Sequence, residues 1–207
     1  RVEYAVGHGV SVQAPVAGPD GRVTTARTTW LPTSALSRFN QDTTTAAVAV
    51  SPLLADVARL SLDISRLSGG AFDVTFGPMF DLWGFGRSGP RRVPDDASFA
   101  RVLATCGYTH LDVPSPTSLR KNLPGVQVAF NALAPGYAAE HLTGLLRKRG
   151  LTNTYVDVGG EVVVRGRNLK GDPWRIGIER PVYDTEPGSG LEAIVALTDR
   201  ALATSGD

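Results

Sequence analysis

The segment from Ser51 to Leu67 constrains the fold more than any other part of this chain. Ser51 is a residue type that caps helix N-termini, and Pro52 stands at the first helical position, where its missing N–H costs nothing. Apolar residues then recur at alternating spacings of four and three until Gly69 and Gly70 end the pattern. We expect one amphipathic helix whose apolar face is formed by Leu53, Val57, Leu60, Ile64 and Leu67.

The stretch that follows, Ser68 to Gly86, is dense in glycine and aromatic residues and has neither a helical nor a strand period. Glycine adopts backbone conformations that other residues avoid and lets a chain pass close to a bound group. Glycines around Asp73, with Phe72 and Trp83 nearby in sequence, suit a planar ligand that carries phosphate. A packed loop with an aromatic plug explains the same residues, and it is the favoured interpretation when the stretch is considered alone.

The remaining chain mixes helices and strands without a strict βαβ rhythm, which favours an α+β fold. A length of 207 residues favours one elaborated domain. We expect short helices at 34–40 and 95–106 and a longer one at 136–150. We expect strands at 2–12, 110–113, 126–130, 174–179 and 191–197, a hairpin at 155–164 and a loop at 114–124.

Composition excludes several classes of protein. The net charge is +1, so no broad electrostatic footprint for nucleic acid is present. The single cysteine, Cys106, excludes an internal disulfide and a cysteine-rich metal site. No apolar run approaches the roughly 20 residues that span a bilayer. The three histidines are scattered and are interpreted as surface or core residues: His8, His110 and His141.

Two acidic residues, Asp73 and Asp157, lie beside glycines. A carboxylate in such a place binds a cation or a ribose hydroxyl, or it stabilises a turn by accepting from the backbone. Without further information, the residues therefore indicate a glycine-lined pocket with aromatic walls and few carboxylates, and no catalytic residue is assigned.

Taken in order, six segments resemble the FAD:protein FMN transferase (ApbE-type) family. Each is only suggestive by itself, whereas the ordered set, with its spacing, is specific across about residues 28 to 207. The segments are 28–40, 68–86, 131–138, 156–161, 174–181 and 203–207.

The resemblance implies a mixed, T-fold-related α+β architecture and a defined reaction. Such proteins use Mg²⁺ and FAD to place FMN on a threonine of a target flavoprotein, with release of AMP. It further implies acceptors among flavoprotein subunits of membrane redox complexes. It also implies an exported protein, periplasmic or membrane-anchored, whose lipid anchor would lie outside this chain. A relative that binds or hydrolyses FAD without transferring FMN is the alternative.

Carried over by position, the resemblance assigns seven residues. Trp30 matches a flavin-stacking position, although a buried tryptophan is the other explanation. The resemblance assigns FAD contacts to Ala71, Phe72, Asp73, Ala129 and Pro135, and a Mg²⁺ ligand to Ala132, which as alanine offers only its carbonyl oxygen.

Two of these positions depart from the family pattern. Ala129 stands where the family has an aspartate, and Pro135 stands where it often has lysine or glutamate. Both changes remove polar groups from the expected ligand site, so we expect weaker FAD binding or slower turnover. The family also continues beyond the Thr204-Ser205-Gly206 segment, with further metal ligands. We therefore expect residues 1–207 to be one ApbE-like domain, incomplete at its C-terminus and inactive alone.

Overall fold

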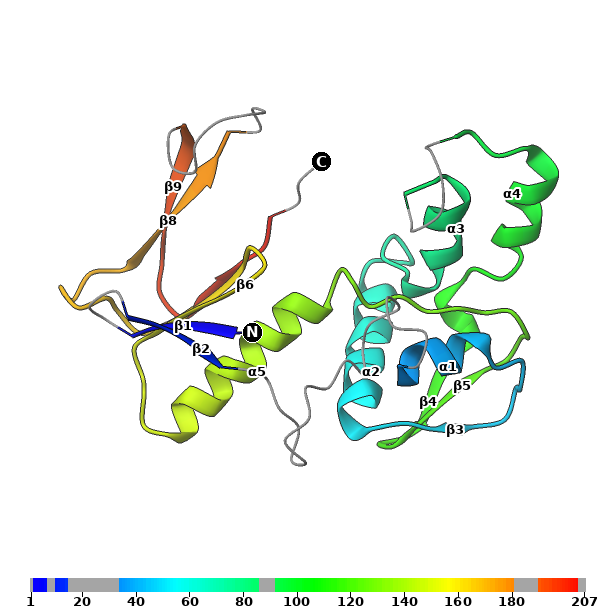
Figure 1. The fold of residues 1–207 in the computed structure, drawn as a ribbon, viewed down its shortest axis with the longest axis horizontal. Coiled ribbons are helices and arrows are strands. Elements are labelled where there is room, and N and C mark those ends of the chain that lie inside the picture. The colour runs from blue at the N-terminus through cyan, green and yellow to red at the C-terminus, as the bar shows by residue number, and fades with distance from the viewer. Residues whose placement is uncertain (1, 7–9, 15–33, 86–91, 181–189, 205–207) are drawn as a thin grey trace. The chain divides into compact units, whose positions relative to one another are not determined.

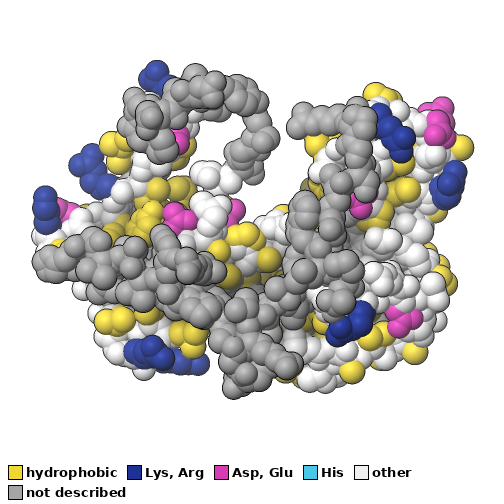
Figure 2. Space-filling view, viewed as in Figure 1, with side chains coloured by type: hydrophobic (Ala, Val, Ile, Leu, Met, Phe, Trp, Pro, Cys, Tyr) yellow, Lys and Arg dark blue, Asp and Glu magenta, His cyan; other side chains and the backbone are white. Residues whose placement is uncertain are grey.

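A computed structural model of the chain describes residues 2–6, 10–14, 34–85, 92–180 and 190–204 (Figure 1). The chain forms two compact units, which are described separately below. One unit is Thr24–Ala134, and the other combines Arg1–Val23 with Pro135–Asp207. Within the described residues no helix is long and apolar enough to cross a membrane. On the face shown in Figure 2, the described Lys and Arg side chains stand in small separate groups.

The Thr24–Ala134 unit packs short helices against a small antiparallel sheet (Figure 1). The sheet has the strand order β3-β5-β4, and α2 packs against β4 and β5. The strands are β3 (Val48–Ala49), β4 (Leu111–Ser115) and β5 (Ser118–Lys121). The helices are α1 (Ala35–Gln41), α2 (Pro52–Leu67), η1 (Val74–Phe76), α3 (Gly77–Leu82), α4 (Asp96–Leu103) and η2 (Tyr108–His110).

Helix α2 has the predicted bounds, and its predicted buried face is confirmed only in part, at Val57. Its N-cap is Ser51, whose side chain accepts from the Leu54 N–H as expected. However, Leu60 is 39% exposed and Leu67 is 88% exposed. The residues that are buried include four small ones, which let the helix backbone approach the sheet closely. The buried residues are Leu54, Ala55, Val57, Ala58, Ser61, Leu62 and Ser65.

A lysine is one of the largest fully buried side chains of this unit. The Lys121 ammonium donates to the carbonyl oxygens of Phe39 at 2.8 Å, Val126 at 3.2 Å and Asn40 at 3.5 Å. It also lies 5.0 Å from the centroid of the Phe39 ring. Burial lowers the pKa of Lys121 below its ordinary value of 10.5, and the charge of Asp42 opposes this shift. Lys121 therefore ties the end of α1 to the chain near Val126.

Replacing Lys121 by methionine is expected to lower the free energy of unfolding by about 2 kcal/mol, because carbonyl groups lose their buried donor. Folding lowers the pKa of Lys121 below 10.5, its ordinary value in the unfolded chain. At pH values between the folded-state pKa and 10.5, the unfolded chain therefore binds more protons than the folded protein. Wild-type stability should therefore rise with pH relative to Lys121→Met in this window. Urea unfolding at several pH values measures both effects. Lys170→Met, at an exposed position, is the control, and equal stability of both variants would contradict the prediction.

In the second unit, α5 (Ala134–Lys148) packs on one face of the hairpin at 154–165, and the two-stranded ribbon at 174–197 packs on its other face. From α5, Ala139 and Leu142 pack with Val156 and Val163. The neighbouring residues of β7 point the other way and pack with Ile176 and Leu197. The strands are β1 (Val2–Val6), β2 (Val10–Ala14), β6 (Thr154–Val158), β7 (Glu161–Arg165), β8 (Trp174–Glu179), β9 (Leu191–Leu197) and β10 (Arg200–Leu202).

Most element predictions are confirmed, and three need correction. The hairpin β6–β7 and strands β8 and β9 lie where the pattern placed them. The expected strand at 2–12 is a hairpin of β1 and β2. The expected loop at 114–124 contains β5, which pairs with β3 and β4. The expected strand at 126–130 is extended chain that pairs with no strand of the described part.

Candidate functional site

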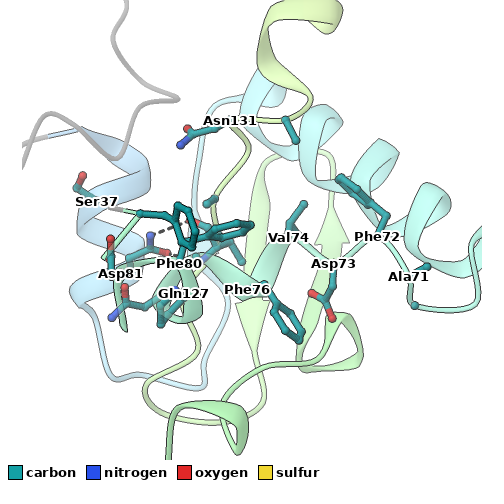
Figure 3. A pocket seen from close by; sticks show the side chains of 18 of the residues that line it. Ser37, Ala71, Phe72, Asp73, Val74, Phe76, Phe80, Asp81, Gln127 and Asn131 are labelled. Carbon is teal, nitrogen blue, oxygen red and sulfur yellow. Dashed lines mark hydrogen bonds between the residues drawn. The ribbon is translucent and has the colours of Figure 1, made fainter. Parts of the chain in front are cut away.

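The candidate site is a cavity of about 790 Å³ whose described lining residues all belong to the Thr24–Ala134 unit. Three segments line it: the C-terminal end of α1, the chain from Gly70 to Asp81 with Phe85, and residues 127–132. Figure 3 shows Phe76, Phe80 and Val74 across its middle. Ser37, Asp81 and Gln127 lie toward one side of this view, and Ala71, Phe72 and Asp73 toward the other. The cavity thus has an apolar centre, several polar side chains on one side and the Asp73 carboxylate on the other.

The glycine-rich loop, which is the stretch from Ser68 to Gly86 described above, begins at the end of α2 and leads directly into the cavity. Gly69 and Gly70 have φ angles of +62° and +86°, a region that glycine adopts without strain. The Gly70 N–H donates to the Ser65 carbonyl at 2.8 Å, which closes the helix. The Ser68 hydroxyl then accepts from the Phe72 N–H at 3.0 Å. These bonds fix the path of the chain through residues 71–73.

Asp73 is the centre of a local hydrogen-bond network. Its Oδ1 accepts from the Thr75 N–H at 2.8 Å and from the Thr75 hydroxyl at 2.6 Å. Its Oδ2 accepts from the Tyr108 N–H at 2.7 Å. The fully buried Thr75 hydroxyl in turn accepts from the Gly107 N–H at 2.6 Å. Asp73 therefore joins η1 to the start of η2, which is the turn-stabilising role that sequence analysis left open.

The segment 126–132, which is extended from Val126 to Phe130 and then turns, forms another wall by alternating its side chains. Val126, Val128 and Phe130 are at most 1% exposed and enter the core. Gln127 and Asn131, with Ala129 between them, line the cavity. This is the two-residue period of a strand. The prediction of extended chain at 126–130 is therefore confirmed, but no strand of the described part pairs with it.

Side chains and backbone groups supply the bonds that a neighbouring strand would give. Asn40 donates through Nδ2 to the Val128 carbonyl at 2.9 Å and accepts through Oδ1 from the Val128 N–H at 2.9 Å. The Ala129 N–H donates to the Val74 carbonyl at 2.8 Å. Gly77 also approaches closely, because a Cβ built there would lie 3.2 Å from the Ala129 Cβ. The wall is thereby held against both α1 and the glycine-rich loop.

Polar side chains of the cavity fall into two groups. The side chains of Asp73 and Asn40 are committed to internal hydrogen bonds. Those of Asp81, Gln127 and Asn131 form no hydrogen bond within the described part of the chain. The second group is free to contact a ligand. Sequence analysis missed Asp81 and Gln127, although Asp81 belongs to the stretch that was singled out.

Other titratable residues of the described ranges do not line this cavity. His110 pairs through Nδ1 with Asn122 Oδ1 at 2.8 Å, and His141 stacks on Tyr137. Neither histidine lines the cavity, and His8 lies outside the described residues. Burial, and to a lesser degree the charge of Asp73, raises the pKa of the Cys106 thiol. The thiol therefore stays protonated near neutral pH.

The structure brings together five of the seven residues that the resemblance assigns. Ala71, Phe72, Asp73, Ala129 and Ala132 all line the cavity. Pro135 is the second residue of α5, belongs to the other unit and does not line it. The remaining assigned residue, Trp30, lies outside the described residues.

The described residues do not make up a Mg²⁺ site. No group of three or more His, Cys, Asp or Glu side chains in the described part is arranged to hold a metal ion. Mg²⁺ takes oxygen ligands in near-octahedral geometry, usually with one or two carboxylates. Ala132 offers only its carbonyl, and the Asp73 carboxylate already accepts three hydrogen bonds.

Comparison with known proteins gives consistent results for sequence and structure. The ApbE family model matches residues 16–207. The FAD:protein FMN transferase of Klebsiella pneumoniae is 38% identical over 182 residues, which is 86% of this chain and 51% of that protein. The Salmonella typhimurium protein of the same name is 37% identical, with 84% and 50% covered. The chain thus spans about half the length of the curated relatives it matches.

Solved structures extend the likeness to the fold. The flavin transferase ApbE from Vibrio cholerae aligns with a TM-score of 0.78 at 36% identity, covering 88% of this chain and 58% of that one. The apo form of the Pseudomonas stutzeri flavinyl transferase ApbE aligns with a TM-score of 0.79 at 30% identity, covering 90% and 57%. Both structures confirm the predicted mixed architecture. The chain therefore belongs to the ApbE family.

Proposed function

We propose that the whole protein transfers FMN from FAD to a threonine hydroxyl of an acceptor flavoprotein and releases AMP. The observation that carries the proposal is the family match together with one cavity that gathers Ala71, Phe72, Asp73, Ala129 and Ala132. The curated relatives are named FAD:protein FMN transferase, which supports flavin transfer as the reaction. The threonine acceptor and AMP release come from the resemblance stated above.

The reaction exchanges one bond to phosphorus for another. The threonine oxygen bonds to the phosphorus of the FMN half, the bond from that phosphorus to the bridging oxygen breaks, and AMP leaves with that oxygen. The hydroxyl proton passes to a base, for which no described residue is assigned. In this scheme, the cavity binds and orients part of FAD. Positioning of this kind accounts for much of the catalysis in phosphoryl transfer.

Charge and shape indicate which part of FAD enters the cavity. The charged residues among its described lining are Asp73 and Asp81, both carboxylates, which repel a pyrophosphate. Phe76 and Phe80 offer apolar surface at its middle (Figure 3). A neutral ring with its sugar hydroxyls suits this lining better than the phosphates do. We therefore place a ring-and-sugar part of FAD here, with the diphosphate toward the outside.

Mg²⁺ dependence, export and a lipid anchor are also part of the proposal, and only the family resemblance supports them. The acceptor is proposed to be a flavoprotein subunit of a membrane redox complex on the same basis. We likewise propose that this chain is one ApbE-like domain, although it folds as two compact units.

Incubation of the full-length protein with FAD, Mg²⁺ and a threonine-containing acceptor flavoprotein tests the activity. We expect the acceptor to gain the mass of FMN while AMP appears in equal amount. Mass spectrometry locates the modified threonine, and chromatography measures AMP. An acceptor whose mass is unchanged would rule out the transferase, whether or not AMP is formed.

A relative that binds or hydrolyses FAD without transferring FMN remains the second candidate. It is favoured by Ala129, which presents a methyl group to the cavity where the family has an aspartate. AMP release without modification of the acceptor would identify a hydrolase. FAD binding without AMP release would identify a binding protein.

Replacing Asp81 by alanine is expected to weaken FAD binding about fivefold to tenfold, because a ligand N–H or hydroxyl group loses a charged acceptor. Isothermal titration calorimetry with FAD measures the change, and separate titrations with riboflavin and adenosine show which ring system faces this residue. Asp56→Ala is the matched control, since Asp56 is an exposed carboxylate on α2 that pairs with Arg59. Equal affinity of wild type and Asp81→Ala would show that Asp81 does not contact the nucleotide.

A further inference from the structure

The wall formed by residues 126–132 has an unusual support. Its residues 126–130 are extended chain with the side chains of Val126, Val128 and Phe130 buried, yet they pair with no strand of the described part. Buried backbone N–H and C=O groups need partners, since leaving one unpaired costs on the order of 1–3 kcal/mol. At Val128 both groups are paired with a single side chain, that of Asn40, 88 residues away in sequence.

The chemistry of this pair requires an amide. Asn40 donates through Nδ2 and accepts through Oδ1, both at 2.9 Å, so it presents to Val128 the donor and acceptor that a strand partner would present. A carboxylate has two acceptors and would face the Val128 carbonyl with a repelling oxygen. A hydroxyl reaches one group only. An aspartate or alanine at position 40 therefore cannot satisfy both groups of Val128.

The same contact joins two walls of the cavity. Asn40 belongs to α1, whose end contributes Ser37, Asn40 itself and Gln41 to the lining, and Val128 belongs to the 126–132 wall. Lys121 strengthens this joint, because its ammonium donates to both the Phe39 and Val126 carbonyls. The two walls are thereby fixed to each other through the adjacent α1 residues Phe39 and Asn40.

We propose that Asn40 is a positioning residue that sets the width of the nucleotide cavity by serving as the strand partner of Val128. The identity of the ligand as FAD rests on the proposed function. Independently of the ligand, the Asn40 amide binds Val128 and thereby holds the neighbouring residues Gln127 and Ala129 at the places from which they line the cavity. No direct contact between the Asn40 amide and the ligand is required.

The test uses Asn40→Ala and Asn40→Asp in the full-length protein, with FAD as the probe. Both variants should bind FAD at least tenfold more weakly at a temperature where circular dichroism shows them fully folded. Loss of stability alone would leave affinity unchanged under that condition. Asn122→Ala is the matched control, because Asn122 also forms two side-chain hydrogen bonds, to Thr109 and His110, but does not line this cavity.

Hydrogen exchange gives a second readout that does not depend on FAD. The Val128 amide should exchange at least tenfold faster in both Asn40 variants, while amides of the β4–β5 ladder keep their wild-type rates. Wild-type affinity in folded Asn40→Ala, or an unchanged Val128 exchange rate, would overturn the inference. If the wild-type protein itself fails to bind FAD, the proposed function is wrong, and Val128 exchange alone then decides whether Asn40 positions this wall.

Discussion

Replacing Asp73 by alanine is expected to weaken FAD binding more than tenfold and to lower the free energy of unfolding by about 2–3 kcal/mol. The carboxylate accepts three hydrogen bonds, from the Thr75 N–H, the Thr75 hydroxyl and the Tyr108 N–H. Hydrogen bonds to a charged group contribute more than neutral ones, and their loss leaves donors without partners in a half-buried site. Calorimetric titration with FAD and urea unfolding measure the two effects.

Thr75→Val separates a supporting role of Asp73 from direct contact with the ligand. Thr75 is fully buried, so its side chain cannot touch a bound nucleotide, yet its hydroxyl links Asp73 to the Gly107 N–H. If Asp73 acts by shaping the loop, Thr75→Val should reproduce much of the affinity loss. If Asp73 instead binds FAD directly, the valine variant should bind FAD like wild type and only Asp73→Ala should lose affinity.

Replacing Phe130 by alanine is expected to give the largest loss of stability, about 3–5 kcal/mol, because it empties a fully buried aromatic site. Phe130 anchors the 126–132 wall in the core, between residues that line the cavity. For a protein with a typical stability of about 5–15 kcal/mol, this change removes a large share of the total. The variant should unfold at much lower urea concentration and bind FAD only in proportion to its folded fraction.

Phe99→Ala is the control for that measurement. Phe99 lies on α4 and is 37% exposed, so its removal leaves no closed cavity and should cost well under half as much. A Phe130→Ala variant as stable as Phe99→Ala would show that the 126–132 wall is not anchored through this ring.

Helices and hairpins were predicted well where the signal consists of residues that act on the backbone next to them. The Ser51 cap, Pro52 and the glycine pair define the bounds of α2 because each acts on the backbone of its own neighbourhood. The β6–β7 hairpin was equally clear from two alternating runs around Gly159 and Gly160. The buried face of α2 was predicted only in part: Val57 is buried, but Leu60 and Leu67 are exposed, and small residues such as Ala58, Ser61 and Ser65 are buried instead.

Long-range partners could not be predicted from single segments. Val126 to Phe130 has the period of a strand, but whether a strand, a side chain or solvent pairs with it depends on chain 88 residues away. For the same reason Asn40 and Lys121 carried no signal as supports of a site. Of the site itself, the sequence indicated the 68–86 stretch and, through the resemblance, residues 129–132. For Asp73, the sequence left open a ligand contact and a turn-stabilising role, and the structure shows its carboxylate in hydrogen bonds within the protein.

A crystal structure of the full-length protein with FAD tests the central claim most directly, namely that the cavity of the Thr24–Ala134 unit holds the nucleotide. The account predicts a ring-and-sugar part of FAD between the 70–81 segment and residues 127–132. In that complex Asp81 should lie within hydrogen-bond distance of a ligand donor, and the Asn40–Val128 pair should stay intact. FAD bound elsewhere, with this cavity empty, would contradict the account.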